Sequence, residues 1–421
     1  MGTFHPHEFL RFVLGTLSHL GTKFDRQRCW CPRSVFAAVL LLTRARRRTT
    51  YRSMMQTFVD DTAALLGWTK RPSVASLSAA RAKLGVADCR MMLRVLSERL
   101  ATMTPARFKH ASGRRFIGLD GVRFVCPRSR DTRRRLNEAK YNSWFSSHCP
   151  QALAVVAVDL LKRLPLDFVL LPKGRGERLG AQVLSGHFVP GDVAVMDCGF
   201  PARWLLKEFL GKKLDLLLRM TAATAGSWPE VAAFLRSGKT EAIVPVRIDR
   251  TTTVPLRLVR RNFRRGRPRR GQVPQTMVIL TTLTTDQGFD RESIIALYAA
   301  RWGVETIFRE MKCEFDIERF HARSVAGIEQ EIAAVLAWIA FASAIQLLAE
   351  SKLPDGRRVY RTLCFDEATR VMNAILAGHD LSEALITAID NVCRYHYGNR
   401  SGRSFPRERK SPLGRFEKTV K

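Results

Sequence analysis

Two short apolar runs that each end at an aspartate constrain the fold of this chain more than any other feature. Segment 116–121 reads FIGLDG and segment 193–199 reads VAVMDCG, so Asp120 and Asp197 each follow an apolar run and precede a glycine. Short apolar runs bounded by turn residues are typical of buried strands. The pattern predicts an α/β fold with both aspartates at the carboxyl ends of strands, where open α/β sheets bind ligands. Either aspartate alone could equally be a turn residue.

The rest of the chain divides into helical and strand-like stretches. Residues 1 to about 105 show helical spacing of apolar residues, and serines precede a basic helix predicted over 73–84. After 290 the chain returns to helical patterns. Further strands are predicted at 153–161, 214–218, 243–248, 254–259 and 278–282.

Positive charge dominates the composition. The chain of 421 residues has 70 Lys and Arg against 38 Asp and Glu, a net charge of +32, and 54 of the cations are arginines. The arginine fork matches phosphate groups, so this excess indicates a polyanionic partner such as nucleic acid. A hydrophobic content of 46% excludes a disordered chain. Runs at 44–48 and 260–270 and the helix carrying Arg81 concentrate arginines, and we expect Arg47 and Arg81 to contact DNA.

Cysteine usage and the apolar segments indicate a compartment. Nine cysteines form no CxxC pair, which favours free thiols in a reducing cytoplasm over a zinc site or disulfides. The first residues lack the pattern of a signal peptide. Residues 332–349 are uncharged and just long enough to span a membrane, but they include Gln346 and lie between two glutamates. We therefore expect a buried core helix and no membrane partner.

A third acid lies in a cluster of polar residues near position 300. On one continuous helix, Tyr298, Arg301, Glu305 and Lys312 would share an arc of about 60°. A carboxylate flanked by Arg and Lys is either part of a salt-bridge ladder or a site for a metal ion and a phosphate. The residues alone leave both interpretations open.

The spacing Tyr, two residues, Arg, three residues, Glu, six residues, Lys resembles the signature of DDE transposases of insertion-sequence family four, a bacterial cut-and-paste type. Asp120 and Asp197 match the first two acids of that family, and Arg219 matches a common arginine. The second motif of the family usually reads Asp-Arg-Gly-Tyr, whereas residues 197–200 read DCGF. The basic segment 403–407 resembles the C-terminal motif of the family.

The resemblance implies an α/β fold with an RNase-H-like catalytic domain. A mainly β insertion would interrupt that domain, and a helical DNA-binding domain would precede it. The implied boundaries are the N-terminal DNA-binding domain at 1–105, the first catalytic part at 106–220, the insertion at 221–290, the second catalytic part with the Glu helix at 291–400 and a basic tail at 401–421.

The resemblance also implies the chemistry. Asp120, Asp197 and Glu305 would bind two Mg²⁺ ions, with Mn²⁺ able to substitute, and cleave DNA by phosphoryl transfer. Double-stranded DNA at the transposon ends and at the target would be the partner, within a synaptic homodimer in the cytoplasm at the bacterial nucleoid. The residues expected to contact DNA are Tyr298, Arg301, Lys312, Arg219, Arg47 and Arg81.

Two other functions remain open. A structure-specific DNA nuclease would use the same chemistry without strand transfer. A catalytically inactive, regulatory DNA-binding protein derived from a transposase would keep the positive charge but would not need Asp120, Asp197 and Glu305 together.

Overall fold

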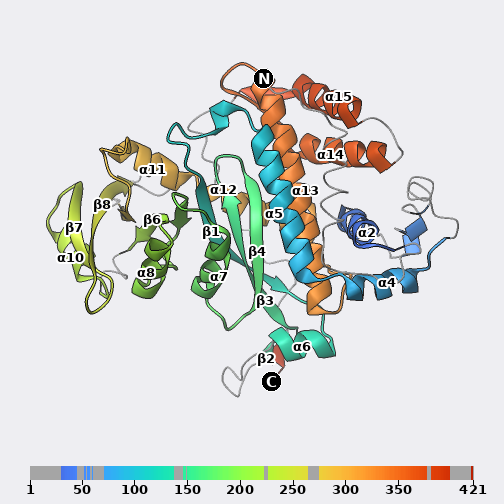
Figure 1. Ribbon diagram of the computed structural model, residues 1–421, viewed down its shortest axis with the longest axis horizontal. Helices are drawn as coiled ribbons and strands as arrows, with labels where there is room; N and C mark the ends of the chain where they lie inside the picture. The colour runs from blue at the N-terminus through green and yellow to red at the C-terminus, as the bar shows by residue number, and fades with distance from the viewer. Residues whose placement is uncertain are drawn as a thin grey trace.

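The computed structural model describes residues 30–44, 52–53, 55–56, 59, 71–136, 146–147, 149–221, 226–263, 275–376, 381–398 and 419–420. They form a mixed α/β structure around a large sheet (Figure 1). Arg47 and the 403–407 motif lie outside the described residues.

An eight-stranded sheet with the order β4-β3-β1-β5-β6-β9-β8-β7 organises the molecule. β1 runs parallel to β5, and β5 runs parallel to β6, whereas the other neighbouring pairs are antiparallel. The strands are β1 (Phe116–Val125), β3 (Gln151–Asp159), β4 (Leu164–Pro172), β5 (Val193–Met196), β6 (Asp215–Met220), β7 (Glu241–Arg247), β8 (Thr253–Phe263) and β9 (Gln275–Thr281).

The central strands differ in length, and this difference places the first aspartate. β5 ends at Met196, opposite Leu119, but β1 continues to Val125 because it remains paired with β3 as far as Gln151. Asp120 therefore lies within β1, opposite Val156, and not at its end as we predicted. It lies one residue beyond the end of the parallel pairing with β5.

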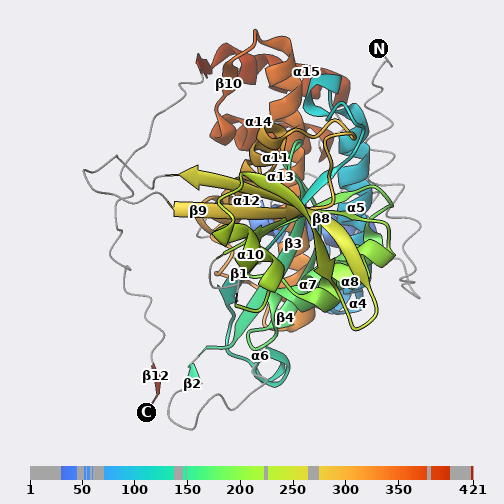
Figure 2. The same ribbon diagram turned by 90° about the vertical axis from the view of Figure 1, so that its left-hand side faces the viewer.

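The segment predicted as an insertion extends the same sheet. α10 (Pro229–Arg236) precedes β7 and β8, and β9 joins this group to the central strands by pairing Leu280 with Leu218 of β6. Figure 2 shows β8 and β9 crossing in front of the central strands. The three strands predicted in this segment are confirmed as strands, with bounds shifted by a few residues.

Side chains alternate across the sheet and build two cores. Along β1, Phe116, Val122 and Phe124 pack into the larger core, whereas Ile117 and Leu119 pack into the smaller one. Helices close both faces. The larger core includes residues of α2 (Pro32–Arg44), α4 (Val74–Lys83), α5 (Val86–Met103), α12 (Trp302–Arg309), α13 (Val325–Lys352), α14 (Arg361–Leu376) and α15 (Leu381–Arg394), and the smaller includes residues of α7 (Glu177–Leu184), α8 (Arg203–Gly211) and α10.

Helix α13 passes through the larger core beside α5 (Figure 1). It is long and apolar enough to cross a membrane by length and composition, but 94% of its most apolar window is buried inside the protein. This agrees with the predicted core helix. The remaining described elements are α6 (Arg130–Leu136), α11 (Arg291–Ala299) and the short strands β2 (Ser146–Ser147), β10 (Arg357–Val359), β11 (His396–Gly398) and β12 (Thr419–Val420).

Candidate active site

Arg301 lies between the first and the third predicted acids. Its Nη1 donates a hydrogen bond to Oδ2 of Asp120 at 3.0 Å, and its Nη2 donates to Oε1 of Glu305 at 3.0 Å. The Arg301 side chain is 5% exposed, against 14% for Asp120 and 39% for Glu305. Arg301 thus reaches Asp120, which lies 181 positions earlier in the sequence.

A glycine lets the helix that carries Glu305 approach β1. A Cβ atom on Gly118 would lie 2.7 Å from Cγ2 of Val304 and 2.5 Å from Cδ2 of Leu160. Both distances are too short for any larger residue unless the side chains of Val304 and Leu160 shift. The glycine two residues before Asp120 therefore sets the separation between the first and third acids.

Asp197 follows β5 in a tight turn. Its Oδ1 accepts a hydrogen bond from the backbone N–H of Gly199 at 2.8 Å, which fixes the carboxylate beside the end of the sheet. Asp197 can therefore be both a turn residue and a site residue, because the turn uses only one of its two carboxylate oxygens.

A fourth acid, which the sequence did not single out, lies beside the first two. A Cβ on Gly121 would lie 2.5 Å from Oε1 of Glu177, and a Cβ on Gly199 would lie 3.3 Å from its Oε2. Burial raises the pKa of Glu177, and the negative charge of Asp197 raises it further, although Arg123 lowers it. Glu177 is the first residue of α7, on the opposite face of the sheet from α12. The available signal was an acid directly after the turn KGRG, a typical helix start.

The acids raise the cost of ionising one another. The pKa of Asp120 is raised from 3.8 to about 6, mainly by burial. The Gly121 N–H and the Arg301 guanidinium lower this pKa, whereas Asp197 and Glu177 raise it. Burial therefore outweighs the hydrogen bond from Gly121 and the positive charge of Arg301 in setting the pKa of Asp120.

Buried polar atoms without partners surround the same point. Tyr298 is 4% exposed, and its hydroxyl, which lies beside Arg301, has no hydrogen-bond partner of regular geometry among the described residues. The same is true of Nε of Arg219 and Nε of Arg301. Burial raises the pKa of Tyr298, while the charges of Arg301 and Arg219 lower it and Asp197 raises it. Unpaired donors of this kind are expected where a ligand completes the site.

The segment from Tyr298 to Lys312 is not the single helix that we predicted. α11 ends at Ala299, and the N–H groups of Arg301, Gly303 and Val304 bond to carbonyls three residues earlier, so the chain tightens before α12. Lys312 lies in a π-helical turn, Glu310–Glu314. Its Nζ donates to the Arg123 carbonyl at 2.9 Å. Lys312 is thus directed further along β1 than Asp120.

Arg81 does not form part of a DNA-contacting surface. It is 5% exposed, and its guanidinium donates to Gln330, to the Gly327 carbonyl and to Glu331 at 3.0–3.1 Å. The predicted DNA contact at this residue is wrong, because burial and pairing with Glu331 commit the side chain to joining α4 to α13.

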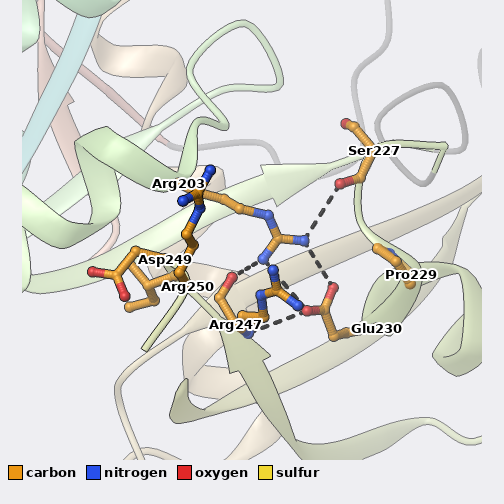
Figure 3. A pocket seen from close by; sticks show the side chains of 8 residues that line it. Arg203, Ser227, Pro229, Glu230, Arg247, Asp249 and Arg250 are labelled. Carbon is orange, nitrogen blue, oxygen red and sulfur yellow. Dashed lines mark hydrogen bonds and ion pairs between the residues drawn. The ribbon is translucent and has the colours of Figure 1, made fainter. Parts of the chain in front are cut away.

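A cavity of about 550 Å³ lies away from these acids, between α8, α10 and the end of β7 (Figure 3). The Arg203 guanidinium lies 4.3 Å from the ring of Trp228 and bonds to Glu230. Since its central charges pair with each other, we assign no chemistry to it.

The predicted acids carry the right donor atoms for a divalent metal ion, but they are not arranged to hold one. Carboxylate oxygens are the ligands that Mg²⁺ prefers. Among the residues that the structure describes, however, no group of three or more His, Cys, Asp or Glu side chains is arranged to hold a metal ion. The Arg301 guanidinium lies between two of the three predicted ligands.

Comparison with known proteins identified a matching family and similar solved structures. Residues 112–341 match the family model described as "Transposase DDE domain". No curated protein sequence matches the chain. Among solved structures, the chain is similar to one titled "Cryo-EM structure of piggyBac transposase synaptic complex with hairpin DNA (SNHP)", with a TM-score of 0.46 and 12% sequence identity. That match covers 96% of this chain and 87% of the other.

Proposed function

Because this chain belongs to the transposase DDE domain family, we propose that it is a DNA transposase of the insertion-sequence family four type. It binds the ends of an insertion sequence, cleaves the DNA strands and joins them to target DNA. The observation that carries the proposal is the meeting of Asp120, Arg301 and Glu305 beside Asp197 at the end of β5. A synaptic homodimer in the bacterial cytoplasm, at the nucleoid, belongs to the same proposal.

Strand order supports an RNase-H-like catalytic core. In that interpretation, β4, β3 and β1 form an antiparallel unit, and β5 and β6 follow in parallel with β1. The proposed catalytic parts are 106–220 and 291–400, with 221–290 inserted between them. The helical residues 1–105 precede them as the proposed DNA-binding domain, and 401–421 form the basic tail.

We assign the metal-binding role to Asp120, Asp197 and Glu305. They would hold two Mg²⁺ ions, or Mn²⁺ in their place, and the bound ions would supply Lewis-acid activation of the attacking and leaving oxygens. The raised pKa of Asp120 supports this assignment, because a carboxylate that is costly to ionise alone is stabilised by a nearby cation. Glu305 would have to exchange Arg301 for that cation.

Arg301, Tyr298 and Arg219 would then face the phosphate. In this proposal, Arg301 holds Asp120 and Glu305 apart until DNA arrives and then turns its fork to a phosphate oxygen. The unpartnered hydroxyl of Tyr298 and the unpartnered Nε of Arg219 supply further donors. Lys312 adds positive charge beside Arg123, further along β1.

A plasmid assay tests the proposal. The wild-type protein, given Mg²⁺ and a plasmid carrying the inverted repeats that flank its gene, should excise the segment between them and join it to a second plasmid. Asp120→Asn, Asp197→Asn and Glu305→Gln should each abolish cleavage and leave binding of the ends intact. Cleavage of branched DNA without any joining would indicate the nuclease alternative. Binding without cleavage by the wild-type protein would indicate a regulatory DNA-binding protein.

A further inference from the structure

Five exposed arginines occupy eight consecutive residues at one end of the molecule. They are Arg128, Arg130, Arg133, Arg134 and Arg135, on α6 and the turn before it. Their side chains form no ion pair or hydrogen bond with the residues that the structure describes, although the charge of Arg135 partly offsets the burial that raises the pKa of Glu329 on α13. We call this set the α6 arginine surface. Arginines without partners on one short helix are costly to keep together unless a polyanion neutralises them.

The helix that carries these arginines is firmly attached. Oδ2 of Asp131, the acid within α6, accepts the Val325 N–H at the start of α13 at 2.7 Å. The Ser129 hydroxyl donates to the Arg323 carbonyl at 2.6 Å, and Thr132 and Leu136 are buried. The carboxylate of Asp131 is thus engaged with the backbone of α13 and not with the arginines beside it. The arginines project from a fixed support.

The α6 arginine surface lies beyond the carboxyl end of β1, the strand that carries Asp120. The part of β1 from Asp120 to its end at Val125 covers roughly 17 Å at a rise of about 3.4 Å per residue. α6 follows after a short turn, at the lower end of the sheet in Figures 1 and 2. One base pair of B-DNA occupies about 3.4 Å. A duplex lying along β1 with its reacting phosphate at Asp120 would reach α6 about five base pairs away.

We propose that the α6 arginine surface binds the phosphate backbone of duplex DNA, starting about five base pairs from the reacting phosphate. The position on the duplex rests on the proposed function; the binding of DNA itself rests on the charge of the surface. Arginine forks suit phosphate oxygens, and such contacts position DNA without reading its sequence. A membrane does not fit, because Leu136, the one apolar residue of α6, is buried in the protein.

Salt dependence of DNA binding gives the test. The triple variant Arg133→Ala, Arg134→Ala, Arg135→Ala should lower the slope of log K against log salt by about 2.7, at about 0.9 for each phosphate contact. Between 50 and 200 mM salt, the loss of affinity should then be roughly 40-fold smaller than for the wild type. The probe is a 30-base-pair duplex of arbitrary sequence without metal. If the triple variant does not fold, Arg134→Ala alone should give about one third of the slope change.

A control variant removes three positive charges from another part of the molecule. The variant Arg357→Ala, Arg370→Ala, Arg394→Ala alters exposed arginines on β10, α14 and α15, at the opposite end of the molecule. It should keep the wild-type slope. Equal slopes for the α6 variant, the control and the wild type would overturn the proposal.

Duplexes of graded length separate this surface from the proposed function. With DNA ends extended by 3, 6, 9 and 12 base pairs beyond the cleavage point, wild-type affinity should rise once about five base pairs are present. The α6 variant should lack this rise and still cleave saturating DNA. An unchanged rise in the α6 variant would overturn the proposed position. Absence of cleavage by the wild type, with the slope change retained, would refute the transposase proposal alone.

Discussion

The substitution Asp120→Asn should stabilise the metal-free fold while abolishing cleavage. The pKa of Asp120 is raised from 3.8 to about 6, so the folded protein holds the proton more tightly than the unfolded chain does. The shift is roughly 2 pH units, and at 1.36 kcal/mol per unit the ionised carboxylate costs the fold about 3 kcal/mol. Above pH 6 this cost is fully present. Below about pH 4 both states are protonated and the cost is absent.

Urea unfolding in EDTA at pH 4 and pH 7.5 measures the effect. At pH 7.5 the variant should have a free energy of unfolding about 3 kcal/mol higher than the wild type, and at pH 4 the two should be equal. Asp167→Asn is the control, because Arg90 and Arg94 pair with this buried carboxylate at 2.8–2.9 Å and its loss should destabilise the protein. An Asp120→Asn protein that is no more stable than the wild type at pH 7.5 would refute the reasoning.

Three further predictions concern the same centre. The affinity for Mg²⁺ should rise with pH through about 6 as Asp120 ionises in the metal-free protein, and a pH profile of metal affinity without that limb would contradict its role. Glu177→Gln should move this limb to lower pH, because the charge of Glu177 raises the pKa of Asp120; an unmoved limb would make Glu177 a purely structural residue. Gly118→Ala should cost about 1–3 kcal/mol in urea unfolding and also reduce cleavage, since the added methyl pushes Val304 away. An unchanged free energy of unfolding in that variant would show that α12 can shift away from Gly118 at no cost.

The sequence predicted the buried parts of the sheet well. The bounds Val193–Met196 of β5 match the predicted run, because a short fully buried strand is apolar at every position and ends at a turn aspartate. β4 was missed, since Pro165 and Asp167 interrupt its apolar pattern. The length of β1 depends on pairing with β3, a long-range contact that no local pattern contains.

The catalytic role of the three acids stays a prediction, and the geometry around them differs from the one that the sequence suggested. The spacing of Tyr298, Arg301 and Glu305 suggested one helix face, whereas tertiary packing tightens the chain between α11 and α12. Arg81 has the same charge as a surface arginine, and only its distant partner Glu331 distinguishes it. Glu177 could not be grouped with Asp197, because a helix start gives no information about which strand end lies opposite.

The short length of β5 affects how the acidic centre around Asp120 and Asp197 can evolve. Beyond Met196, β5 no longer continues beside β1, so Glu177 on α7 acts on Asp120 and Asp197 from one face of the sheet, whereas Arg301 reaches Asp120 from the side of α12. Substitutions on α7 can therefore adjust the acidity of the centre without disturbing the packing of α12 against Gly118. The two layers of helices can therefore change separately during evolution. Selection on the rate of the reaction need not compete with selection on the packing of α12, the helix that carries Glu305, against β1.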